Sequence, residues 1–268
     1  MAKKSMKKLA LVVSLIMLLS IVLLGCGNDT EKEPEVKSEP VEINISAAAS
    51  LTDALNEIQV EFEKESDNTL VFNFGSSGAL QKQIQEGAPC DLYISASKKH
   101  MDVLEDEGKI VPDTRKDLLG NTLTLIASSE KADVIKDYSA LTSSDVESIS
   151  IGTPESVPAG NYAKESFETL NIWDQIQSKL VFAKDVRQVL EYVDSGNTDC
   201  GLVYHSDAML LKTGKIVCDM PEDSHSPIVY PIAITTDAKQ AEAAKEFYDF
   251  LENDTSTSIF EKYGFTVK

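Results

Sequence analysis

The stretch that decides the fold is residues 45–55, ISAAASLTDAL. Before it, Val41–Ile45 alternates apolar and polar residues, as a short strand does. After it, apolar residues recur at helical spacing from Leu51 to Phe62. Ser50 stands at the expected N-cap, where its hydroxyl would meet amides that lack partners inside the helix. The positive end of a helix dipole behind small residues is a ready place for an anion. A plain N-cap is the simpler explanation of any single turn of this kind.

The first 25 residues are typical of an export signal. Four lysines precede the continuous apolar run Leu9–Leu24, and Gly25-Cys26 follows it. A basic start, an apolar core and small residues at the end describe a secretory signal. The ending resembles the lipobox of bacterial lipoproteins, whose cysteine is lipidated. We therefore predict a signal peptide over 1–25, a lipid anchor on Cys26 and an extracytoplasmic protein held at the membrane. A transmembrane anchor is the alternative, although the run is slightly short for a span of about 20 residues.

Charge limits the partners of this chain. Residues 26–40 are polar, charged and proline-bearing, which predicts a flexible tether. The formal charge is −19, and it becomes −23 when the four lysines of the signal are removed. So acidic a surface argues against nucleic acid and anionic lipid as binding partners. An anionic ligand is still compatible with it, because exposed charges are screened within about 8 Å.

Cysteine and histidine give no pattern of a metal-cation site. Cys90, Cys200 and Cys218 remain after the signal, and no histidine lies near two of them at ligand spacing. The three histidines, at positions 100, 205 and 225, are not spaced i, i+4. A Cys200–Cys218 disulfide and buried free thiols are both compatible with an exported protein.

From residue 41 onwards, strand-like and helix-like segments alternate, which predicts an α/β fold of mainly parallel sheets flanked by helices. Crossing points at Leu118–Asn121 and Val229–Pro231 predict two lobes joined by a two-strand hinge. Lobe 1 would comprise 41–119 and 231–268, and lobe 2 would comprise 120–230. Two consecutive domains would give a similar pattern. The expected strands are 42–46, 70–74, 91–95, 123–127, 148–152, 179–183, 201–204 and 228–235; the expected helices are 51–65, 79–86, 98–107, 161–170, 186–195 and 238–253.

Three further turns repeat the arrangement of a strand that leads through small residues into a helix. They are Phe74–Leu80 (FGSSGAL), Pro154–Gly160 (PESVPAG) and Lys184–Arg187 (KDVR). In the last of them Asp185 is expected to cap the helix, leaving the next amide free. A fifth element ends a buried strand at Tyr204. Ligands of open α/β sheets bind at the carboxyl ends of the strands. These turns together predict a cage of neutral donors that contains no lysine or arginine.

Nine motifs, in order over residues 42–268, resemble the periplasmic molybdate-binding proteins of ABC transporters. They are AAASLTDAL, FGSSGALQKQI, GAPCDLYISAS, LLGNTLTLIA, VPAGNYAKE, KDVRQVLEYV, GLVYHSDA, YPIAI and FEKYGFTVK. The resemblance implies a two-lobed type II periplasmic binding protein that closes on molybdate or tungstate. It also implies a permease with its ATPase as partners, no cofactor beyond the ligand and no catalytic step. We expect a monomer.

The resemblance also assigns the site residues. The matched positions are the hydroxyls of Ser50, Ser77 and Tyr204 and the amides of Ala159 and Val186. They would bind molybdenum as its oxyanion, with no direct ligand to a metal cation. The chain departs from the family at Cys90, where a small residue is usual, and at His205 after the tyrosine. His205 could add a donor, but we expect it to point to solvent.

Two other functions compete with this one. A donor-only cage suits a fully ionised tetrahedral dianion, because a protonated ligand would lose about 1–3 kcal/mol for lack of an acceptor. Sulfate meets the same requirement, so only the size of the cavity would exclude it. A serine hydrolase would use Gly75–Ala79 as a nucleophile elbow, with Asp207 or Asp223 and His225. That elbow lacks its final glycine.

Overall fold

The structure is a computed structural model that describes residues 39–268. Of these, Pro40–Lys268 form one compact unit. The predicted signal over 1–25, Cys26 and nearly all of the tether lie outside the described residues. Within 39–268, no helix combines the length and the apolar character needed to cross a bilayer.

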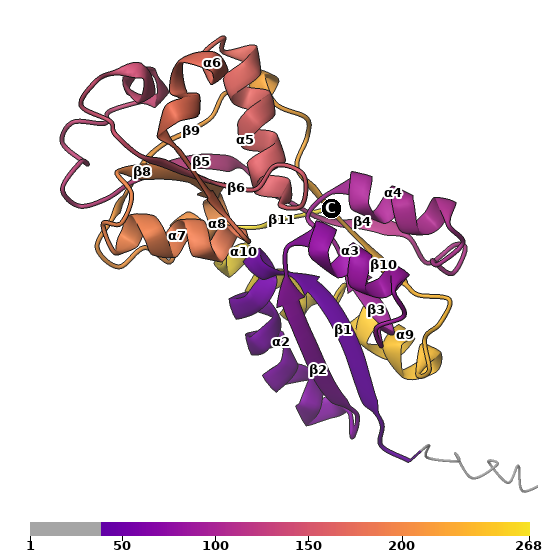
Figure 1. Cartoon of the computed structure of the whole chain (residues 1–268). Coiled ribbons are helices and arrows are strands. Elements are labelled where there is room, and N and C mark those ends of the chain that lie inside the picture. Colours follow the sequence, from indigo (N-terminus) through magenta and orange to yellow (C-terminus); the bar gives the residue numbers. More distant parts are fainter. Residues whose placement is uncertain (1–38) are drawn as a thin grey trace, which may run out of the picture. The chain divides into compact units, whose positions relative to one another are not determined.

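The first sheet has six strands in the order β11-β4-β10-β3-β1-β2 (Figure 1). Strand β1 is parallel to β2 and to β3, whereas β10 is antiparallel to both β3 and β4. Strand β11 is antiparallel to β4 at the edge. The strands are β1 (Glu42–Ala48), β2 (Thr69–Gly75), β3 (Leu92–Ile94), β4 (Lys116–Gly120), β10 (Val229–Ile234) and β11 (Thr266–Val267).

The second sheet has five strands in the order β7-β6-β8-β5-β9. Strand β6 is parallel to β7 and β8, and β5 is antiparallel to β8 and β9. The strands are β5 (Leu123–Ala127), β6 (Ile149–Gly152), β7 (Leu180–Ala183), β8 (Cys200–Tyr204) and β9 (Lys215–Asp219).

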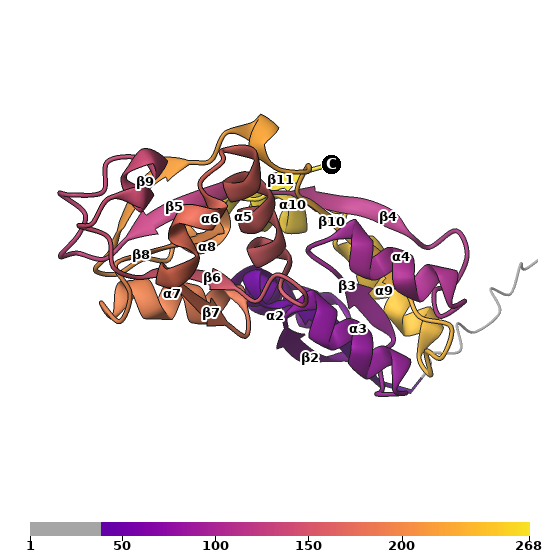
Figure 2. The same cartoon turned by 45° about the horizontal axis from the view of Figure 1, so that its top comes forward.

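Helices flank both sheets, so the predicted α/β class is confirmed. Helices α3 and α4 pack together beside the first sheet, and α5 and α7 pack on the second (Figures 1 and 2). The helices are α2 (Thr52–Glu65), α3 (Ser77–Gln85), α4 (Lys98–Asp106), α5 (Pro158–Thr169), α6 (Trp173–Ile176), α7 (Val186–Asp194), α8 (His205–Ala208), α9 (Ala241–Phe250) and α10 (Asp254–Lys262). Short 3-10 turns are η1 (Ala49–Leu51), η2 (Tyr138–Thr142), η3 (Gln177–Lys179) and η4 (Glu222–Ser224).

Both sheets are mixed rather than mainly parallel, and the route of the chain explains why. The chain passes from the first sheet to the second between β4 and β5, and it returns between β9 and β10. Strands β1 and β8 end at the edge of their sheet where the chain crosses to the other sheet. Strands β10 and β5 begin at that edge after a crossing, so β10 runs antiparallel to the direction of β1, and β5 runs antiparallel to β8. Val229 and Tyr230 pair with β4 of the first sheet, just before the predicted lobe boundary at 230/231.

Two cysteines lie too far apart to form the disulfide that the sequence allows. Cys200 on β8 pairs with Ala127, and Cys218 on β9 pairs with Leu125, on opposite sides of β5. Two strand spacings amount to about 9–10 Å, beyond the Cα separation of a disulfide. Both thiols are free, as is that of Cys90, whose burial raises its pKa to about 11.

An aromatic cluster at the end of α2 supports a stability prediction. The ring of Phe62 is 1% exposed and lies edge-on to Phe247 at 5.1 Å and to Phe250 at 5.2 Å. Phe62→Ala should therefore lower the free energy of unfolding by about 3–5 kcal/mol. Urea denaturation would measure it. Val60→Ala on the same helix, at a side chain 58% exposed, is the control and should change stability by under about 0.5 kcal/mol.

Candidate anion-binding site

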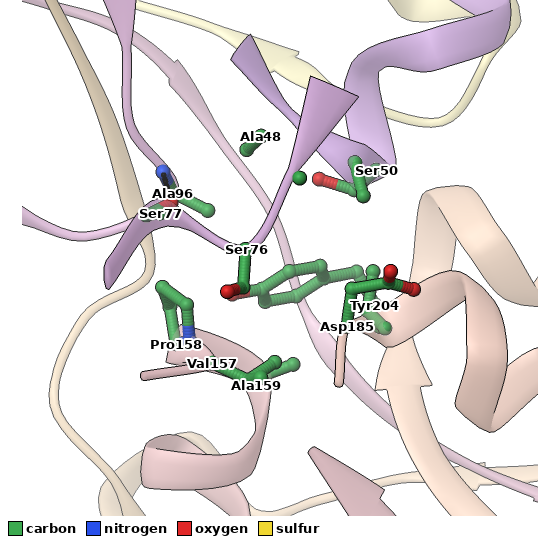
Figure 3. A pocket seen from close by; sticks show the side chains of 13 residues that line it. Ala48, Ser50, Ser76, Ser77, Ala96, Val157, Pro158, Ala159, Asp185 and Tyr204 are labelled. Carbon is green, nitrogen blue, oxygen red and sulfur yellow. Dashed lines mark hydrogen bonds between the residues drawn. The ribbon is translucent and has the colours of Figure 1, made fainter. Parts of the chain in front are cut away.

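A small cavity lies where strands β1, β2 and β8 end and where η1, α3, α5 and α7 begin (Figure 3). The volume of the cavity is about 10 Å³, which is room for about one water molecule. Its lining comprises Ala48, Ala49, Ser50, Gly75, Ser76, Ser77, Ala96, Val157, Pro158, Ala159, Asp185, Val186 and Tyr204.

All five residues predicted from the sequence to bind the ligand line this one cavity. Ser50 lies in η1, Ser77 is the first residue of α3, and Tyr204 is the last residue of β8. Ala159 is the second residue of α5, and Val186 is the first residue of α7. Residues from five separate parts of the chain thus share one small space between the two sheets.

The predicted capping role of Ser50 is wrong. Leu51 holds the N-cap position of α2, and its helix has no side-chain cap. The Oγ of Ser50 instead lies 2.9 Å from the hydroxyl of Tyr230. The chain turns through η1 before α2 begins, which places Ser50 in the middle of η1, two residues before the first residue of α2. The hydroxyl of Ser50 therefore accepts no hydrogen bond from an amide of α2. Figure 3 shows it directed into the cavity region.

Ser77 is fixed by hydrogen bonds from β3 and from the segment that follows it. Its Oγ accepts a hydrogen bond from the amide of Ala96 at 2.9 Å, and its carbonyl accepts one from the hydroxyl of Tyr93 at 2.8 Å. Ser76, which was not assigned to the site from sequence, is the N-cap of α3 without a side-chain capping bond, and it also lines the cavity. Two adjacent serine hydroxyls thus stand at the start of one helix.

The amides of α5 and α7 are arranged as the sequence predicts. Pro158 begins α5, so the next amide, that of Ala159, belongs to the first turn and has no acceptor within the helix. Asp185 caps α7 by accepting from the amide of Gln188 at 2.9 Å. The carboxylate of Asp185 is thereby engaged by its own helix, and the amide of Val186 follows it at the cavity wall.

Tyr204 carries a buried hydroxyl with no hydrogen-bond partner among residues 39–268. The side chain is 1% exposed, and burial raises its pKa well above the usual value. The hydroxyl therefore keeps its proton over the physiological range. A buried donor without an acceptor costs about 1–3 kcal/mol, which a ligand with acceptor oxygens would recover.

A single arginine stands beside the cavity without lining it. Arg187 follows Val186, and its guanidinium pairs with Asp53 and with Asp207, each at 2.6 Å. It also donates to the carbonyl of Ser50 at 3.2 Å. The burial of Asp207 raises its carboxyl pKa to about 6, against the opposing effect of Arg187. The cation is thus balanced by two carboxylates, and neither lysine nor arginine lines the cavity.

Backbones from the two sides of the cavity touch directly at Gly78. Its amide donates to the carbonyl of Ser156 at 2.9 Å. A Cβ on Gly78 would lie 2.7 Å from that oxygen and 2.8 Å from the Ser156 Cα. The glycine therefore permits close approach of the α3 start to the loop before α5, a contact that the sequence alone does not identify.

The features of an enzyme or a cation site do not come together. Ser77 Oγ meets a backbone amide, and Asp207 pairs with Arg187. His225 lies on another face, beside α5 and η4, with its Nδ1 2.8 Å from the carbonyl of Ser226. His205 does not line the cavity, and its side chain is 39% exposed. Over residues 39–268 there is no group of three or more His, Cys, Asp or Glu side chains placed to hold a metal ion.

A buried, donor-lined cavity between two sheets joined by two strand passages defines a two-lobed solute-binding protein rather than an enzyme. The chain belongs to the bacterial extracellular solute-binding protein family, whose model matches residues 43–266. It is 45% identical to YvgL of Bacillus subtilis, named as a candidate ABC transporter substrate-binding lipoprotein, over 92% of this chain and 94% of that protein. It is 42% identical to the molybdate-binding protein ModA of Escherichia coli, over 84% and 89% respectively.

A solved structure shows the same fold. The periplasmic molybdate-binding protein of Azotobacter vinelandii superimposes with a TM-score of 0.76 at 22% identity. The match covers 84% of this chain and 99% of that one. The predicted two-lobed periplasmic binding fold is confirmed.

The ion pair beside the cavity gives a pH-dependent prediction. Arg187→Met would leave the Asp207 carboxylate, 0% exposed, without its counter-ion. At pH 8 Asp207 is ionised in the unmodified protein, so the variant must either bury an unpaired charge or protonate the carboxyl, and the free energy of unfolding should fall by up to about 3–5 kcal/mol. At pH 5, below the pKa of about 6, the carboxyl is largely neutral and needs no cation. Urea denaturation should therefore show a smaller loss at pH 5 than at pH 8.

Arg115 provides the matched control for this measurement. It also pairs with two carboxylates, Asp102 and Glu105, but these side chains are 53% and 49% exposed. Arg115→Met should cost under about 1 kcal/mol at both pH values. Equal losses at pH 5 and pH 8 for the Arg187 variant would contradict the assignment of a buried charge pair.

Proposed function

We propose that this protein binds molybdate, and tungstate with it, in the cavity formed by Ser50, Ser77, Ala159, Val186 and Tyr204. The observation that carries the proposal is the buried Tyr204 hydroxyl, which has no hydrogen-bond partner among residues 39–268 and faces a cavity that no lysine or arginine lines. Fully deprotonated oxyanions offer acceptors only, so each donor gains a partner and no ligand proton is stranded. The relatives named for molybdate binding support the choice of ion.

The wider role follows from the same proposal. Because the cavity has room for about one water molecule, the two lobes would have to part to admit the ion and then close on it. They would present it to a membrane permease driven by an ATPase, with no cofactor and no chemical step. Lipid attached to Cys26 would hold the protein, as a monomer, at the outer face of the cell membrane. The name of YvgL, which describes a lipoprotein, supports this anchoring.

Calorimetry with molybdate, tungstate, sulfate and phosphate tests the ligand. We expect tight binding of the first two and none of the others. Ser50→Ala and Ser77→Ala should each weaken molybdate binding by about 1–3 kcal/mol, because each removes one hydrogen bond to a charged ligand. Ser139→Ala, at an exposed residue of η2, serves as the control and should bind as the unmodified protein does. Sulfate binding as tight as molybdate binding would contradict the proposed selectivity for molybdate. If Ser50→Ala and Ser77→Ala both leave the molybdate affinity unchanged, the site assignment is refuted.

Closure of the lobes gives a second test, at Gly78. Gly78→Ala places a methyl group against the Ser156 carbonyl across the cavity. The affinity for molybdate should fall about tenfold or more, since the lobes can no longer meet as closely. Urea denaturation of the variant without ligand is measured alongside, because the added methyl group would also lie 2.9 Å from Cε1 of the buried His100. Unchanged affinity would show that this contact plays no part in closing.

A further inference from the structure

A chain of hydrogen bonds runs from the passage between the two sheets to the cavity. Ser50 Oγ lies 2.9 Å from the hydroxyl of Tyr230, and both side chains are buried. The Tyr230 oxygen in turn lies 3.3 Å from Nδ2 of Asn121. Asn121 stands between β4 and β5, and Tyr230 lies on β10. The series of hydrogen bonds therefore starts where the polypeptide crosses between the sheets.

The direction of donation along these hydrogen bonds is fixed at Asn121. The side-chain oxygen of Asn121 accepts from the amide of Thr122 at 2.9 Å, which turns Nδ2 the other way. Nδ2 also lies 2.9 Å from the Oγ of Ser206. An amide nitrogen only donates, so the Tyr230 oxygen must accept from it. The proton of Tyr230 is then directed to Ser50 Oγ, and the Ser50 proton is left to point elsewhere, toward the cavity.

We propose that Asn121 and Tyr230 are positioning residues that commit the Ser50 hydroxyl to donate to the bound oxyanion. This inference rests on the proposed function of the same site. Ser77 reaches the same state by a different route, because the donor at its Oγ is the backbone amide of Ala96. Both serines thus have an acceptor position occupied by a donor and a proton free for the ligand. The arrangement favours anions that carry no proton, since the proton of each serine is directed to the ligand and needs an acceptor there.

Tyr230→Phe tests the positioning role. The ring packs against Tyr204 and Phe265, with centroids 5.7 and 5.5 Å away, and phenylalanine keeps these contacts. Calorimetry with molybdate should show an affinity about tenfold lower, since the Ser50 hydroxyl is free to rotate away from the ligand. In a Ser50→Ala background the same substitution should have no further effect. Tyr248→Phe, at a buried tyrosine on α9, is the matched control and should bind normally.

The outcomes separate this inference from the proposed function. Should the unmodified protein fail to bind molybdate, both are refuted. Should Ser50→Ala weaken binding while Tyr230→Phe does not, the function stands and the positioning role is refuted. A tenfold loss from Tyr230→Phe that persists in the Ser50→Ala background would also refute it, because Tyr230 would then act without Ser50.

Reversing the chain gives a second and independent readout. Asn121→Asp replaces the donating nitrogen by a carboxylate oxygen, which would take the Tyr230 proton. The Ser50 proton would then turn to Tyr230, and its lone pairs would face the anion. Affinity for molybdate should fall by more than with Tyr230→Phe alone. Adding Tyr230→Phe to Asn121→Asp should restore part of that loss, whereas a further loss would overturn the proposed direction of the chain.

Discussion

The structure depends on donors that are buried without acceptors of their own. The Tyr204 hydroxyl, 1% exposed and without a partner, is the clearest of them. The amides at the starts of α5 and α7 add others that a helix leaves unsatisfied. Each such group weakens the folded state by about 1–3 kcal/mol when it stays unpaired. Several of them at one small cavity favour a ligand rich in acceptor oxygens, which would supply the missing bonds, and this is the basis of the proposal that the site binds an oxyanion.

The sequence predicts five residues that the structure brings to one cavity, because the parts of this candidate site are local. Each predicted turn is a strand end, a few small residues and a helix start, and all the information lies within about ten residues. The carboxyl ends of β1, β2 and β8 then bring these turns together, as the general rule for open sheets requires. The same reasoning could have given the mixed sheets. A strand that enters a lobe from the crossing side must run opposite to those that end there, as β5 and β10 do.

What the sequence could not give are contacts between distant residues and elements without strong periodicity. Ser50 lies 180 positions from Tyr230, and no local pattern announces that this pair replaces a helix cap. The contacts of Arg187 with Ser50 and Asp53 have the same character. Helix α10, predicted as no element at all, is rich in serine and threonine and is held by the burial of Ile259 and Phe260. Packing decides these features, and propensity does not.

The charge of the protein explains why neutral donors are the better solution for this site. A lysine or arginine in the cavity would attract any small anion, protonated or not, and so would lose selectivity. Here the nearby guanidinium of Arg187 is balanced by Asp53 and Asp207, and the acidic exterior is screened within about 8 Å. Attraction by net charge is therefore not what holds the ligand. In the proposed site, hydroxyls and amides with fixed proton directions would discriminate instead by whether the anion can accept from all of them at once, a condition that a fully deprotonated anion meets.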